Sequence, residues 1–146
     1  MNAVAVACVF FDRHHAVPAT MNDEPARAAV LGNAFDAAAG YLVTLFEALC
    51  VAELRPFLDA DAEALVATQI DWVQRAPVSA GAPLRLTGWI ESAGTRSATF
   101  RVQAHDAHEQ VCEGRLRFDA GERERAERAV ARKHAAMKRG QLFWTA

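Results

Sequence analysis

The chain of 146 residues contains little cysteine and has no zinc-binding spacing of cysteine and histidine. Its three cysteines, Cys8, Cys50 and Cys112, lie in apolar or strand-like stretches. This pattern argues against a disulfide framework. It predicts three buried, reduced thiols of the kind usual in a reducing cytosol.

An excess of one charge and a membrane-spanning apolar run are also absent. Sixteen basic and eighteen acidic residues give a formal net charge of -2, which provides no general attraction toward nucleic acid or an anionic membrane. The apolar run at residues 3–11 follows no basic segment and is far shorter than the roughly 20 residues that cross a bilayer, so it predicts neither a signal peptide nor an anchor. We therefore expect a cytoplasmic protein whose partner is a small molecule or another subunit.

The length fits one domain over residues 1–146, with a core at about 3–118 and a C-terminal helix at about 121–139. No internal repeat or low-complexity linker divides it. Residues 3–11 predict a buried first strand, which the polar residues 12–15 would close. Four further strand-like runs with short connections predict an antiparallel meander, and they lie at about 64–74, 83–92, 96–105 and 109–118.

The apolar stretch at residues 37–58 predicts a helix from about 34 to 55, which Pro56 ends. Apolar residues lie on nearly every side of this helix, as is typical of a buried one. Glu47 lies near its middle, and a carboxylate in such a place must be paired, neutralised or used in chemistry. One sheet can cover such a helix only by curling round it, with help from a second copy. We therefore predict an α+β protein with the hotdog fold, a curved antiparallel sheet of about five strands around one long helix.

Three segments carry a family resemblance. They are Ala-Gly-Tyr-Leu-Val-Thr-Leu-Phe-Glu with its continuation (39–58), Gln-Arg-Ala-Pro-Val-Ser-Ala-Gly (74–81) and Phe-Arg-Val-Gln-Ala-His-Asp (100–106). Together they resemble the hotdog-fold thioesterases, most closely the fluoroacetyl-CoA thioesterase-like family, over about residues 37–118. The resemblance implies an acyl-CoA hydrolase without a cofactor, coenzyme A being part of the substrate. It also implies a homodimer with sites between its subunits, and whether dimers pair into tetramers stays open.

The resemblance assigns roles to individual residues as well. The family's catalytic Glu corresponds to Glu47, its Thr to Ala39 and its His to Gln74. Glu47 of one subunit would then face Gln74 of the other. Because Ala39 and Gln74 replace a hydroxyl and an imidazole, we expect slow hydrolysis of small or medium acyl groups, without selection of a fluorinated one.

The chemistry of these residues leaves alternatives open. Glu47 is a candidate general base or nucleophile, or a structural carboxylate that pairs across a dimer interface. Ala39 and Gly40 would border the substrate at the helix start, where free N–H groups could hold the thioester oxygen, although Gly40 is equally suited to packing. Gln74 can orient water or the acyl carbonyl but cannot take a proton. Thr44 offers a hydroxyl unless that hydroxyl bonds its own backbone.

Other polar and aromatic residues have simpler interpretations. The histidines fit no zinc pattern and are expected in solvent, namely His14, His15, His105 and His108. Coenzyme A phosphates need exposed guanidinium groups, and the candidates are Arg75, Arg96, Arg101, Arg115 and Arg117. Trp72 and Trp89 are expected in the core or in an interface.

Two other functions stay open. A hotdog hydratase or dehydratase would usually pair a His with a carboxylate, and neither Ala39 nor Gln74 offers one. A non-catalytic acyl-thioester-binding protein fits the missing Thr and His. Glu47 opposes that second alternative, because an idle buried carboxylate costs stability.

Overall fold

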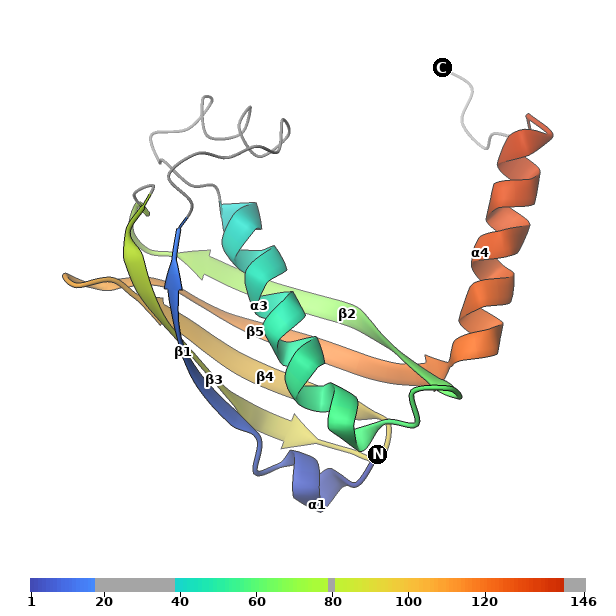
Figure 1. Ribbon diagram of the computed structural model, residues 1–146, viewed down its shortest axis with the longest axis horizontal. Helices are drawn as coiled ribbons and strands as arrows, with labels where there is room; N and C mark the ends of the chain where they lie inside the picture. Colours follow the sequence, from blue (N-terminus) through green and yellow to red (C-terminus); the bar gives the residue numbers. More distant parts are fainter. Residues whose placement is uncertain (18–38, 79–80, 141–146) are drawn as a thin grey trace.

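The computed structural model describes residues 1–17, 39–78 and 81–140. One antiparallel sheet carries a long helix on one face, and a second helix extends away from the sheet (Figure 1). In chain order the elements are α1 (Ala3–Val6), β1 (Phe10–Ala16), α3 (Ala39–Leu54), the 3-10 helix η1 (Arg55–Phe57), β2 (Glu63–Gln74), β3 (Pro83–Ala93), β4 (Ser97–His105), β5 (Gln110–Glu122) and α4 (Arg123–Lys138).

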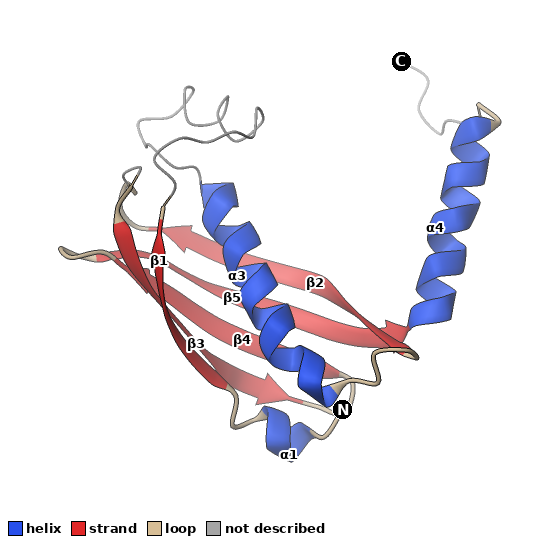
Figure 2. Ribbon diagram, in the orientation of Figure 1, coloured by secondary structure: helices blue, strands red, loops and turns tan. Residues whose placement is uncertain are grey.

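The sheet has five strands in the order β1-β3-β4-β5-β2. All neighbours are antiparallel, and β3, β4 and β5 follow one another through short turns. The two edge strands are therefore β1 and β2, which flank α3 in the chain. Figure 2 shows α3 lying across one face of the curved sheet. The predicted α+β architecture, with about five strands around one long helix, is confirmed.

The strands form because their side chains alternate between the helix face and the outer face. In β4, the buried Ala98, Phe100, Val102 and Ala104 alternate with more exposed residues. The meander was predicted correctly: each of its strands lies within one residue of its expected start, and β5 continues to residue 122 instead of ending at 118.

Helix α3 packs on the sheet through one stripe of buried residues, spaced four apart: Leu42, Phe46, Cys50 and Leu54. The Phe46 ring lies 6.3 Å from that of Phe11 and 5.8 Å from that of Trp72, measured between centroids. These contacts seat the helix between β1 and β2. The helix ends at the predicted place, because Pro56 allows only the short helix η1 to follow.

The prediction for the N-terminus was wrong. Residues 3–6 form a helical turn, because the Asn2 side chain caps it by accepting hydrogen bonds from the N–H groups of Val4 and Ala5. Strand β1 begins only at Phe10 and includes residues 12–15, which were expected to follow the strand. An edge strand tolerates these polar residues because part of it faces water. The predicted helix residues 34–38 lie outside the described residues.

The cysteine prediction was correct for two of the three thiols. Cys50 and Cys112 are free and buried, and burial raises the pKa of both thiols, that of Cys112 to about 12. Cys8 is exposed, because the segment around it forms the helical turn and not a buried strand. Among the described residues, no helix has the length and apolarity needed to cross a membrane.

Helix α4 follows β5 directly and was predicted two residues earlier. None of its residues is buried. Arg123 fixes its start, since its guanidinium donates to the carbonyl oxygens of Ala60 (2.9 Å) and Glu63 (3.2 Å). From that point the helix extends away from the sheet (Figure 1).

Candidate active site

Glu47 borders the buried stripe of α3. It follows Phe46 by one residue, which places it roughly 100° further round the helix axis. The opposite flank of α3 faces β1, where the Glu53 carboxylate accepts a hydrogen bond from Arg13 (3.0 Å). Glu47 therefore lies on the flank of α3 away from β1, toward β2, and it is half-buried there.

The sequence predicted that α3 is buried on all sides, and in a single subunit this prediction is wrong. Thr44, Ala48 and Ala52 are exposed, and the flanks of the helix are only partly covered. The reason is that the sheet is one layer, which covers one side of the helix. The flank that carries Glu47 thus remains accessible beside the edge strand β2.

Gln74 is the last residue of β2 and lies on the helix face of the sheet, like Trp72 two residues earlier. Its side-chain carbonyl accepts a hydrogen bond from the Trp72 indole N–H (3.2 Å). Its amide nitrogen donates to the carbonyl oxygen of Ala76 (2.9 Å). The half-buried side chain of Gln74 is therefore held at both ends, whereas a freely solvated glutamine would not be.

The start of α3 contains the other three candidates. Gly40 is exposed, and a Cβ atom built there would have no atom of the described residues within 4 Å. The Thr44 hydroxyl donates to the carbonyl oxygen of Gly40 (2.9 Å), which is the backbone bond considered from the sequence. Ala39 is the first described residue of the helix.

The structure brings Glu47 and Gln74 to the same side of α3. The contact between the Phe46 and Trp72 rings joins the helix to β2. Glu47 adjoins the first ring in sequence, and Gln74 shares a hydrogen bond and a sheet face with the second. In Figure 1, the first turn of α3 and the C-terminal end of β2 lie at the same end of the sheet. The Glu47 carboxylate and the fixed Gln74 amide thus lie on the side of α3 that adjoins β2.

A histidine contact at the same end of the sheet was not anticipated from the sequence. His15, expected in solvent, is half-buried, and its Nε2 lies 2.5 Å from the Tyr41 hydroxyl. Burial raises the pKa of the Tyr41 hydroxyl. The pair links β1 to the flank of α3 opposite Glu47. Only the tertiary fold joins these residues, which are 26 positions apart.

His105 and His108 lie at a hairpin, as expected, and His14 is an exposed residue of β1. His105 ends β4, and the following turn is closed by Asp106, whose carboxylate accepts from the N–H groups of His108 and Glu109 (both 2.8 Å). These bonds lower the pKa of Asp106. Within residues 1–17, 39–78 and 81–140, no group of three metal-ligating side chains converges.

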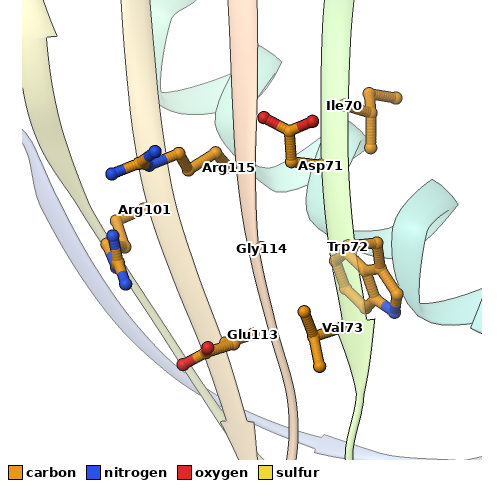
Figure 3. A pocket seen from close by; sticks show the side chains of 8 residues that line it. All are labelled: Ile70, Asp71, Trp72, Val73, Arg101, Glu113, Gly114 and Arg115. Atoms are coloured by element: carbon orange, nitrogen blue, oxygen red, sulfur yellow. The ribbon is translucent and has the colours of Figure 1, made fainter.

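Most of the candidate arginines lie on the face of the sheet that α3 does not cover. They line or adjoin a groove of about 470 Å³, shown in Figure 3 with Ile70, Asp71, Trp72, Val73, Arg101, Glu113, Gly114 and Arg115. Four of them pair with carboxylates of the same chain: Arg75 with Glu113, Arg101 and Arg115 with Glu91, and Arg117 with Asp119. This groove is separate from the side of the helix that carries Glu47.

Comparison with known proteins identifies the family to which this chain belongs. The model of the family of fluoroacetyl-CoA-specific thioesterases matches residues 26–117, which is more than half of the chain. The chain belongs to this family. No curated protein sequence matches it.

Solved structures confirm the hotdog fold. The fluoroacetyl-CoA thioesterase FlK superposes with a TM-score of 0.74 at 23% identity, over 87% of this chain and 96% of that one. A variant of FlK in complex with fluoroacetate and CoA gives 0.70 at 24% identity, over 82% and 97%. A thioesterase superfamily member from Thermus thermophilus gives 0.72 at 16% identity, over 90% and 94%.

Proposed function

We propose that this member of the fluoroacetyl-CoA-specific thioesterase family hydrolyses small or medium acyl-CoA thioesters, with Glu47 as the general base. One observation supports the proposal: Glu47 is half-buried and directly follows Phe46, whose ring contacts that of Trp72. The sequence resemblance assigns this residue to the family's catalytic carboxylate. A carboxylate at this position lies beside apolar side chains and is still accessible to a ligand. Such a place suits proton transfer to and from a bound substrate.

The reaction follows from these groups. Glu47 takes a proton from a water molecule, whose oxygen attacks the thioester carbonyl carbon. The negative charge that develops on the carbonyl oxygen is stabilised by backbone N–H groups near Gly40, toward the N-terminal end of α3. When the C–S bond breaks, the coenzyme A thiolate leaves and takes the proton back from Glu47, which yields the carboxylic acid and free coenzyme A.

Gly40 and Gln74 complete the proposed site. Because Gly40 has no side chain, and no described residue would meet a Cβ atom there within 4 Å, it allows a substrate to approach the helix backbone closely. Gln74 positions the water or the carbonyl by hydrogen bonding, since an amide does not take up a proton near neutral pH. Ala39 offers no hydroxyl, and the Thr44 hydroxyl is bound to the helix backbone. We therefore propose slow turnover and a broad acyl preference.

We propose that the active form is a homodimer. Strand β2 ends the sheet with an edge that no described strand pairs, and it exposes Val66, Ile70 and Val73. A long edge with apolar side chains invites pairing. Beside it, the flank of α3 with Glu47 is only partly covered. A second copy bound along β2 would cover both, and would bring its own Gln74 toward Glu47.

A non-catalytic acyl-thioester-binding protein is the second candidate, favoured by Ala39 and by the fixed hydrogen bonds of Gln74. A panel of acyl-CoA esters, assayed for release of free thiol, separates the two functions. We expect slow release with several short and medium acyl groups. Binding of the esters without release of thiol would favour the binding protein, and release limited to fluoroacetyl-CoA would contradict the broad acyl preference.

A further inference from the structure

The amide of Gln74 has only one orientation compatible with its two partners. The Trp72 indole N–H is a donor only, so it must face the side-chain carbonyl of Gln74. The Ala76 carbonyl is an acceptor only, so it must face the amide nitrogen. Turning the amide by 180° would oppose donor to donor and acceptor to acceptor. The two hydrogen bonds therefore determine the positions of the amide oxygen and the amide nitrogen of Gln74.

This orientation determines what Gln74 still offers to a ligand. The amide nitrogen carries two N–H bonds, of which Ala76 takes one, and the carbonyl oxygen keeps one lone pair beside the bond from Trp72. The side chain lies on the helix face of the sheet, the face on which α3 carries Glu47. None of the described residues takes the second N–H, so one donor of known direction is left for an oxygen atom of the substrate.

The indole of Trp72 is itself held in place by its surroundings. Gly114 lies opposite Trp72 in the pairing of β2 with β5. A Cβ atom at Gly114 would lie 2.6 Å from the indole Cε3, so the ring occupies the space that a side chain would fill. The Phe46 ring contacts the indole from the helix, with 5.8 Å between centroids. The position of the indole N–H is therefore set by packing.

We propose that Trp72 is a positioning residue of this site: its indole N–H orients Gln74 so that the free amide N–H is donated to the carbonyl oxygen of the bound acyl thioester. The proposal rests on the thioesterase function proposed above and extends it to a residue that does not itself contact the reacting atoms. Trp72 then acts only through Gln74. This dependence is what an experiment can test.

A double-mutant cycle, with kcat as the measured quantity, tests whether Trp72 acts through Gln74. Trp72→Phe keeps an aromatic ring against Phe46 but removes the donor, and Gln74→Met keeps similar length but removes both amide bonds. We expect Trp72→Phe to lower kcat roughly three- to ten-fold, the effect of one hydrogen bond, with KM nearly unchanged. In the Gln74→Met background the same substitution should change nothing further. The matched control is Trp89→Phe in β3, on the outer face of the sheet, which should leave kcat unaffected.

An effect of Trp72→Phe that is equal in both backgrounds, or a kcat equal to that of the wild type, would overturn the positioning role. Failure of the proposed function is distinct, because the wild type would then release no thiol. In that case the side-chain amide resonances of Gln74, assigned by their loss in Gln74→Met, decide the question by NMR. Acetonyl-CoA, which keeps the carbonyl but has no cleavable thioester, should shift one of them in the wild type and less in Trp72→Phe. Resonances that do not move at high acetonyl-CoA concentration would refute the proposal.

Discussion

Replacing Gly114 by alanine should destabilise the protein through a contact with Trp72. The added Cβ atom would lie 2.6 Å from Cε3 of the indole and 2.9 Å from the backbone oxygen of Asp71. Both distances are well below normal van der Waals separation, and the second partner is backbone that cannot rotate away. The indole and the adjacent part of β2 would have to move.

The expected cost is that of overfilling a packed site, about 1–3 kcal/mol of unfolding free energy. For a domain of this size, each kcal/mol lowers Tm by roughly 2–4 °C. Urea denaturation measures the first quantity and thermal unfolding the second. Because the indole N–H moves with the ring, Gly114→Ala should also lower kcat, as Trp72→Phe does.

Gly121 provides a matched control in the same strand. A Cβ atom there would meet no atom of the described part of the chain within 4 Å, so Gly121→Ala should be neutral or stabilise the protein by a few tenths of a kcal/mol through loss of unfolded-state entropy. If Gly114→Ala unfolds at the same urea concentration as Gly121→Ala, the packing of Trp72 against Gly114 described above is incorrect.

Three further predictions concern charge, the C-terminal helix and the missing family residues. The Arg85 guanidinium, hydrogen-bonded to Asp12 at 2.7 and 3.0 Å, lowers the pKa of the Asp12 carboxyl. The ion pair therefore stabilises the folded protein above the unfolded-state pKa of about 4. This stabilisation is lost as the pH falls through the lower pKa of the folded state. Arg85→Gln should flatten this acid-side decline in unfolding free energy, and an unchanged slope would refute the assignment. A chain that ends at Arg123 keeps both anchoring bonds and loses no buried residue of α4, so its Tm should stay within a few degrees of the wild type; a large fall would show that the helix supports the core. Restoring the family pair by Ala39→Thr with Gln74→His should raise turnover, since a well-placed proton-transfer group contributes roughly 100- to 10,000-fold, and no gain in a folded variant would show that the scaffold no longer places it beside the substrate.

The sequence predicted the elements whose local patterns were unambiguous. Strand β4 alternates buried and exposed residues along its whole length, and the end of α3 is determined by Pro56. The apolar run at residues 3–11 was ambiguous, because composition alone does not distinguish a short helix from a strand. The cap from Asn2 decided it, and that interaction was not recognised in the sequence.

The candidate site was predicted less completely than the fold. Glu47 could be selected because a carboxylate in an apolar helix is unusual. The hydrogen bond between Trp72 and Gln74 joins residues two apart on one strand face, so alternation could have suggested it. The contact of His15 with Tyr41 depends on how β1 and α3 pack. The helix appeared buried on every side because an amino-acid pattern does not specify how many layers cover it.

Glu47→Gln tests the central claim most directly, since it keeps the shape of the side chain and removes the base. Thiol release from the best acyl-CoA ester should fall by roughly 100- to 10,000-fold, while the molecular mass in solution and the Tm stay unchanged. A folded Glu47→Gln variant that releases thiol at the wild-type rate would contradict the account.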